Sequence, residues 1–282
     1  MPLSARLLSL VAVGASVVLA SCAGEQPSGS FGTDRAATRG AAASAPGDAW
    51  PASPPEGHRW VGDRGVVVAV PDWWTTGDTQ CLLPVEDTVY VETGAMTDCA
   101  APVPPETHRE VSSVAVVPTD LAHGERLVGD LVPDGDVSGQ AVLTGEECGW
   151  IAERACRTVV AVPSLGVAFA MYVADAGDVD PAVFRDSLTL LPDGWTTVPL
   201  ALRGGHTPVW GTEPPTTRDY ARLLEERGFA VRVEPAEPPD SRTSSLVASL
   251  PEGALLDIQP TPGSPIEDGA EVVLTVMPPL PE

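Results

Sequence analysis

The chain has 282 residues, of which 39 are acidic and 16 basic, so its formal net charge is −23. Every basic residue is arginine, which excludes phosphate-loop lysines, Schiff-base lysines and Ser-x-x-Lys acyl-enzyme pairs. The acidic balance argues against nucleic acid as a partner, because binding phosphates requires a basic surface. Hydrophobic residues make up 43% of the chain, which is enough for one or two modest cores.

Residues 1–21 are predicted to be a signal peptide. Arg6 lies just after the amino terminus, and residues 7–19 form an uncharged apolar run of 13 residues. This run is too short to cross about 30 Å of hydrocarbon as a helix, but it has the length of a secretion-signal apolar region. It ends in Leu19-Ala20-Ser21-Cys22, which places an aliphatic residue and two small residues before a cysteine.

This ending resembles the lipobox of bacterial lipoproteins. The resemblance implies cleavage before Cys22 and attachment of a diacylglycerol to its thiol, so that membrane lipid is a partner through Cys22. Cleavage removes one arginine and no acid, which gives a charge of 15 − 39 = −24. The chain would then be anchored durably in the cell membrane, facing outside the cytoplasm. The alternative is an ordinary cleaved signal in which Cys22 is incidental.

Residues 22–56 are predicted to be a flexible tether. They consist mostly of Ala, Gly, Ser, Pro and Thr and show no hydrophobic periodicity. A segment of this composition cannot bury enough apolar surface to offset the entropy lost on ordering.

Residues 57–199 are predicted to form a mainly β domain, either a sandwich or a half-open barrel. Short β-like runs alternate with Gly, Pro and Asp turn signals. One short helix is predicted, with Asp180 as its N-cap, Pro181 at its first position, and Phe184 and Leu188 on one face. The predicted strands are 65–71, 88–92, 111–117, 156–162 and 167–173, and the predicted turns are 133–136 and 192–194.

The cysteine count favours disulfides. Setting Cys22 aside leaves an even four, Cys81, Cys99, Cys148 and Cys156, which permit three pairings. We favour the sequential pairing, Cys81 with Cys99 and Cys148 with Cys156, because it closes short loops. The rival interpretation is a zinc site, but the separations of 18 and 8 residues contain no Cys-x-x-Cys pair.

Candidate catalytic and metal-binding residues are sparse, and we expect neither a cofactor nor a metal. The four histidines, His58, His108, His123 and His206, are not at metal-binding helical spacing. Two acidic clusters suit either weak Ca²⁺ binding or solvated turns: Asp130, Asp134, Asp136, and Asp175, Asp178, Asp180. Five tryptophans either line a sugar groove or fill a β core, with at most one of the adjacent pair inside: Trp60, Trp73, Trp74, Trp150 and Trp195.

Residues 200–282 are predicted to form a small α+β module. A helix begins at the N-cap Thr216, is supported by Asp219 three residues on, and ends at Gly228. Three strands are expected after it, at 229–233, 255–259 and 271–277, with a Pro-rich turn at 260–265 before the last.

This order of elements resembles the PASTA domain over residues 207–277. The resemblance implies one helix packed on a three-stranded sheet, and members of the family occur in extracellular parts of bacterial envelope proteins, where some bind peptidoglycan fragments. The alternative is a spacer module without a ligand. The positions that carry the resemblance are Ala221, Leu224, Arg227-Gly228-Phe229, Gln259-Pro260-Thr261-Pro262-Gly263 and Gly269-Ala270-Glu271-Val272.

Together these features predict a lipid-anchored envelope protein outside the cytoplasm that binds or scaffolds without catalysis. Peptidoglycan or an envelope protein is the expected partner, and nucleic acid is not. Two alternatives stay open: a carboxylate-based cell-wall hydrolase in residues 57–199, and a wall-sensing accessory of another membrane protein. A hydrolase requires a cleft with a carboxyl group whose pKa is raised by burial, whereas a binding protein requires an exposed aromatic patch.

Overall fold

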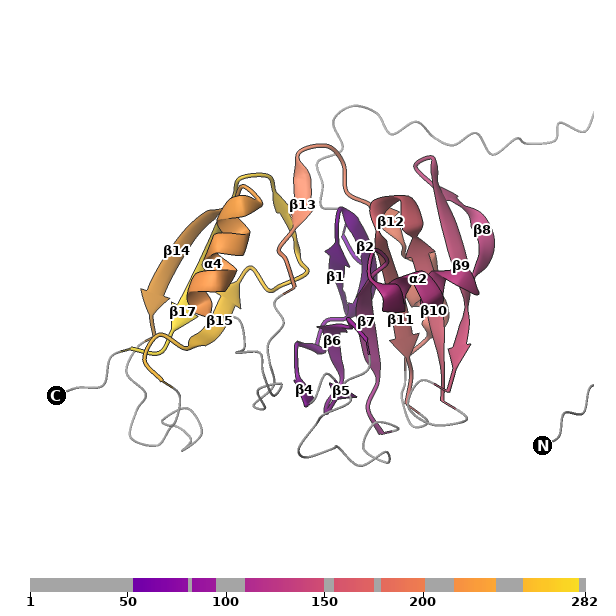
Figure 1. Ribbon diagram of the computed structural model, residues 1–282, viewed down its shortest axis with the longest axis horizontal. Helices are drawn as coiled ribbons and strands as arrows, with labels where there is room; N and C mark the ends of the chain where they lie inside the picture. The colour runs from indigo at the N-terminus through magenta and orange to yellow at the C-terminus, as the bar shows by residue number, and fades with distance from the viewer. Residues whose placement is uncertain are drawn as a thin grey trace, which may run out of the picture. The chain divides into compact units, whose positions relative to one another are not determined.

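The computed structural model describes residues 53–80, 83–94, 110–149, 155–174, 179–200, 216–236 and 251–278, and in these ranges the protein is mainly β, as predicted. Figure 1 shows that the described parts consist mostly of strands and, towards the C-terminus, that helix α4 lies on a small sheet. The predicted signal peptide and almost all of the predicted tether lie outside the described residues. No helix in the described ranges is long and apolar enough to cross a membrane.

The largest sheet has seven strands in the order β3-β6-β7-β11-β10-β9-β8. Neighbours among β3, β6 and β7 are parallel, and all later pairs are antiparallel. The strands are β3 (Thr75–Thr76), β6 (Thr88–Val91), β7 (Ser113–Pro118), β8 (Val132–Val137), β9 (Gln140–Cys148), β10 (Cys156–Val162) and β11 (Val167–Tyr172).

A second sheet, β1-β2-β12, packs on one face of the seven-stranded sheet. It consists of β1 (His58–Asp63), β2 (Val66–Pro71) and β12 (Thr189–Leu190). Every residue of β2 is buried, as its continuous Val/Ala run predicts for a strand covered on both faces. Its valines pack with Val114, Val160 and Phe169 in one core. The arrangement is a sandwich of two sheets, one of the two architectures predicted.

Helix α3 (Pro181–Asp186) confirms the helix predicted in this region. The Asp180 side chain accepts a hydrogen bond from the Ala182 N–H at 2.9 Å, and Phe184 is buried in the core between the sheets. Pro181 occupies the first turn, where its missing N–H costs nothing.

The prediction of only one helix in residues 57–199 is wrong, because α2 (Ala122–Gly129) covers the other face of the seven-stranded sheet. Its sequence carries two glycines and its N-cap, Leu121, makes no side-chain cap. Local propensity is therefore low, and packing of Leu127 against the sheet stabilises the helix. A short 3₁₀ turn, Pro163–Leu165, was also not predicted.

The turn predicted at 133–136 is wrong as well. These residues lie within β8, which pairs with β9 through an irregular register between Pro133 and Asp136. Gly135 has a φ of +85° at this irregularity, so it forms part of a β-bulge. The chain reverses later, at Ser138 and Gly139. The turn predicted at 192–194 is present, with Gly194 at φ +85°. A separate two-stranded sheet pairs β4 (Thr79–Gln80) antiparallel with β5 (Leu83–Pro84).

The C-terminal part places α4 (Thr217–Glu226) on the sheet β14-β17-β15, so the predicted helix and three strands are present (Figure 1). Thr216 and Asp219 form the expected capping box, and Gly228 takes a φ of +87° after the helix. Leu224, Val272 and Leu274 are fully buried between helix and sheet. The strands are β14 (Ala230–Pro235), β15 (Leu255–Gln259) and β17 (Glu271–Val276), with β14 parallel to β17.

The C-terminal core also draws on residues before position 200. Strand β13 (Trp195–Thr197) pairs with β16 (Pro265–Glu267), and Val198 is buried in the same core as α4. The Gly62 N–H, on β1, donates to the Gly263 carbonyl at 2.9 Å. Contacts group residues 49–282 as one unit, and the domain boundary predicted at 199/200 falls inside it and stays a prediction.

Candidate functional site

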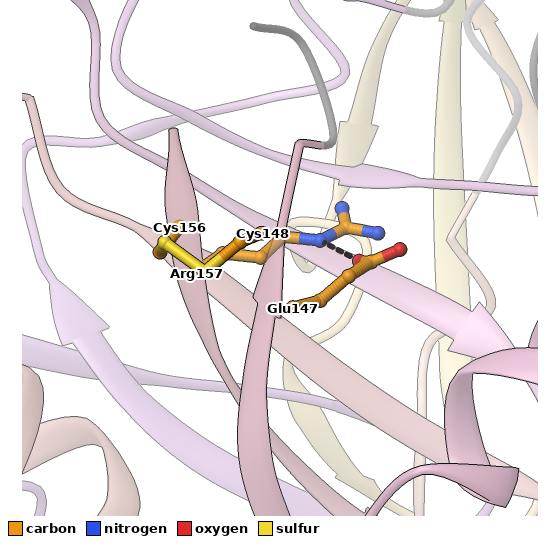
Figure 2. The surroundings of a disulfide bond; sticks show 4 residues. All are labelled: Glu147, Cys148, Cys156 and Arg157. Carbon is orange, nitrogen blue, oxygen red and sulfur yellow. Dashed lines mark hydrogen bonds and ion pairs between the residues drawn. A yellow bond between two sulfur atoms is a disulfide. The ribbon is translucent and has the colours of Figure 1, made fainter. Parts of the chain in front are cut away.

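A disulfide joins facing positions of β9 and β10. Cys148 and Cys156 are directly opposite in the antiparallel register, with their Cα atoms 4.0 Å apart, so this half of the predicted pairing is confirmed. The neighbouring pair, Glu147 and Arg157, is also in register, and the Arg157 Nε–H donates to Glu147 Oε2 at 2.6 Å. Figure 2 shows the disulfide and this ion pair side by side, pointing away from each other, as expected for successive residues of a strand.

Arg157 lies in the interior of the protein, with 1% of its side chain exposed. Arg157 lies on the face of β10 that α2 covers. Val159 and Ala161 follow it on the same face and belong to the core that packs against α2. Its guanidinium reaches Glu92, which directly follows β6, 65 residues earlier in the chain. Nη1 donates to Oε2 at 2.5 Å and Nη2 donates to Oε1 at 3.1 Å, so the pair is bidentate.

Two further side chains complete this cluster around Glu92. The Tyr90 hydroxyl donates to Glu92 Oε2 at 3.2 Å from a buried position on β6. His123, on the first turn of α2, has its Nε2 2.7 Å from Glu92 Oε1. This is an ion-pair distance, although the orientation does not meet the geometry of a hydrogen bond. We call Tyr90, Glu92, His123, Glu147 and Arg157 the buried ionic cluster.

The cluster holds Glu92 in its ionised form. Burial by itself raises the pKa of Glu92, but the interactions with His123 and Arg157 outweigh burial and lower the pKa to about 2. For Arg157, burial lowers the pKa and the bonds to Glu92 raise it, and the net direction is upward. Burial and the charge of Glu92 raise the pKa of the Tyr90 hydroxyl, which keeps it a neutral donor.

This shift predicts an acid-dependent loss of stability. The pKa of Glu92 falls from 4.5 to about 2 on folding, so its contribution is fully present above pH 4.5 and is lost as pH falls through 2. The difference corresponds to about 3 kcal/mol. We expect urea unfolding curves recorded from pH 6 to pH 2 to show this loss in the native chain. The Glu92→Gln variant, less stable throughout, should lack it, and parallel curves for the two proteins would contradict the prediction.

The geometry gives the cluster a structural role. A general acid needs a carboxyl group whose pKa is raised, whereas Glu92 is ionised, doubly paired with Arg157 and buried. The cluster ties together the end of β6, helix α2 and the strands β9 and β10, which the disulfide also joins. It therefore fixes the α2 face of the large sheet and is not suited to proton transfer.

A different surface, after β2, presents the aromatic pair. Trp74 is 3% exposed, whereas Trp73 is 63% exposed, as predicted for adjacent residues of which one enters the core. The two rings contact edge to face with centroids 6.2 Å apart. Arg59 holds the segment in place, because its Nη2 donates to the carbonyls of Trp74 and Thr75 at 3.1 Å each and to the Thr76 hydroxyl at 2.8 Å.

Carboxylates also lie close to this segment. Glu86 interacts with Asp78, and burial and the charge of Asp78 raise the pKa of the exposed Glu86. A glycosidase needs an acid whose pKa is raised by burial in a cleft, whereas Glu86 is exposed. The pair therefore does not match a glycosidase site.

Those of the remaining predicted residues that the structure describes do not assemble into a site. Asp136 accepts a hydrogen bond from the Gly139 N–H at 3.2 Å within a turn, and Asp180 caps α3. Trp60 and Trp195 are half-buried on β1 and β13. In the described ranges, no three His, Cys, Asp or Glu side chains gather as metal ligands. Cys22, Cys81, Cys99, His108, Trp150, Asp175, Asp178 and His206 lie outside the described residues.

Comparison with protein-family models, with curated proteins and with solved structures finds no significant match for this chain. The resemblances to the lipobox and to the PASTA domain therefore stay predictions, and the helix-on-sheet fold of the C-terminal part is established by the structure alone.

The buried ionic cluster was not predicted, although two features of the sequence pointed to it. Glu92 ends the alternation of β6 on the same face as Tyr90, and Arg157 opens the alternation of β10 on the same face as Val159. A charged residue in register with a buried face needs a partner of opposite charge. The strand order decides which acid meets which arginine, and the strand order cannot be predicted from the local sequence pattern.

Proposed function

We propose that this protein is a lipid-anchored envelope protein outside the cytoplasm that binds a wall polymer or an envelope protein without catalysis. The observation that carries the binding role is Trp73, which is 63% exposed, while its neighbour Trp74 is buried and Arg59 holds the Trp74 and Thr75 carbonyls. An exposed indole on a fixed segment offers a flat apolar face at low entropic cost, which is the usual form of an aromatic contact residue.

Two further observations support this proposal. The Cys148–Cys156 disulfide is typical of proteins outside the cytosol. Among the described carboxyl groups, Glu92 is buried but has a lowered pKa, and Glu86 has a raised pKa but is exposed, so neither is the buried acid with a raised pKa that the hydrolase alternative requires. The choice of a wall polymer rests on the resemblance of residues 207–277 to the PASTA domain.

The binding role predicts that Trp73→Ala lowers affinity for purified cell-wall material by roughly tenfold, because exposed tryptophans dominate such contacts. The measurement is co-sedimentation of the full chain, carrying Cys22→Ala, with insoluble wall fragments. Val132→Ala is the matched control, since Val132 is another exposed apolar side chain, on β8. Equal binding by the Trp73 and Val132 variants would contradict a role of Trp73, and no binding above that of a charge-matched control protein would contradict wall binding altogether.

The same Cys22→Ala protein tests the anchor. Loss of fatty-acid labelling and release into the medium are expected when the acylated thiol is removed. Membrane retention equal to that of the native chain would contradict lipid attachment at Cys22, whatever the result of the wall-binding measurement.

A further inference from the structure

Strand β14 forms an outer edge of the C-terminal sheet. Within the strands that the structure describes, β14 is paired with β17 on one side and is last in the order β14-β17-β15. Five of its six residues are exposed, and Val233 is 51% exposed although its neighbour in the alternation, Val231, packs against the core. An edge that exposes an apolar side chain is open to pairing with another strand.

The backbone of β14 directs alternate groups outward. The Ala230 N–H donates to the Ala270 carbonyl and the Ala236 N–H donates to the Val276 carbonyl, so the even-numbered residues face β17. Val231 and Val233 therefore present their N–H and carbonyl groups at the outer edge. Pro235 also faces outward, but it has no N–H to donate, so the strand that pairs here is short.

The charges on this edge are self-complementary. Arg232 and Glu234 lie on either side of Val233 and form an ion pair within the strand, and Arg232 Nε is also 3.1 Å from Glu271 Oε1 on β17. If two β14 strands pair antiparallel about Val233, each Arg232 lies opposite a Glu234 of the second copy. Such facing positions bring Cβ atoms to about 4.5–5.5 Å, which suits a cross-strand ion pair.

We propose that two copies of this chain associate through β14, antiparallel, with Val233 on the two-fold axis. The two Val233 residues exchange backbone hydrogen bonds and cover each other's side chains, and two Arg232–Glu234 pairs flank them. A second copy fits better than an unrelated strand because the pattern of plus, apolar, minus is complementary to its own reverse. The two three-stranded sheets then become one sheet of six strands.

Sedimentation velocity on the full chain in mild detergent tests this pairing. The formal charge of −23 repels two copies, so the buffer contains about 150 mM salt, which screens charges more than about 8 Å apart. We expect a dimer whose fraction rises with protein concentration. Val233→Lys should weaken it about tenfold or more, because a charge on the axis faces its own copy. A monomer at every concentration, or a dimer unaffected by Val233→Lys, would overturn the proposal.

Charge exchange distinguishes pairing through β14 from a general effect of surface charge. Arg232→Glu should weaken the dimer about tenfold, because Glu then lies opposite Glu234, and Arg232→Glu with Glu234→Arg should restore it to within about threefold. Arg222→Glu, on the exposed face of α4, makes the same change in charge and should have no effect. An equal loss from Arg222→Glu, or no recovery in a double variant that circular dichroism shows to be folded, would refute the pairing.

Discussion

Arg157→Met is expected to lower the free energy of unfolding by about 3–5 kcal/mol, because it removes one partner of a buried ion pair. Methionine fills much of the volume of the arginine, so the loss is electrostatic. The substitution leaves the Glu92 carboxylate in the interior, where His123 and Tyr90 remain but the bidentate partner Arg157 is gone. Urea unfolding at pH 7 measures the loss, and an unchanged dependence on urea concentration shows that the unfolded state is the same.

The control for this prediction is a double-mutant cycle. Adding Glu92→Leu to Arg157→Met removes the buried charge as well as its partner and should recover about 2 kcal/mol or more. Arg185→Met should cost less than about 1 kcal/mol, because Arg185 and Asp186 form an exposed pair on α3. If the double variant is no more stable than Arg157→Met alone, the unpaired Glu92 is not the cause of the loss.

Gly124→Ala is expected to destabilise the protein by about 3 kcal/mol, because α2 approaches the preceding chain too closely for a side chain. A Cβ at position 124 would lie 2.1 Å from the Pro118 carbonyl oxygen and 2.7 Å from the Thr119 Cα. Both are backbone atoms, so the helix itself must move. His123, the neighbouring residue, would then move from Glu92, and thermal unfolding should show the loss.

Gly129→Ala is the matched control in the same helix. A Cβ there meets no atom within 4 Å, so alanine should stabilise the helix by up to about 1 kcal/mol through its higher propensity. A Gly124→Ala protein as stable as Gly129→Ala would show that α2 can shift without cost. It would contradict the view that close packing, in place of local propensity, positions this helix.

Elements with a local chemical signature were predicted from sequence. The N-caps Asp180 and Thr216 each accept a hydrogen bond from a backbone N–H two or three residues on, and the structure shows both helices. The Cys148–Cys156 pair was predicted because the sequential pairing closes short loops, and the two residues face each other across β9 and β10. Each of these features depends on residues close in the chain.

Elements stabilised by distant contacts were missed or misassigned. Helix α2 has a poor cap and two glycines, so its own sequence predicts a loop, and the sheet beneath it supplies the stabilisation. Pro133 to Asp136 has a turn composition, but pairing with β9 extends it as an irregular strand. Strand β16 was not predicted, and its partner β13 lies about 70 residues earlier in the chain.

By itself, the sequence determined the mainly β class, the helix and strands of the C-terminal part and one disulfide, because hydrophobic period, capping and turn chemistry act over a few residues. Only the tertiary structure decided that Glu92 meets Arg157, that Trp73 is the exposed member of its pair, and that β14 is an outer edge. These results depend on strand order and on which face each layer covers. Both are set by burial summed over the whole core, which no short segment encodes.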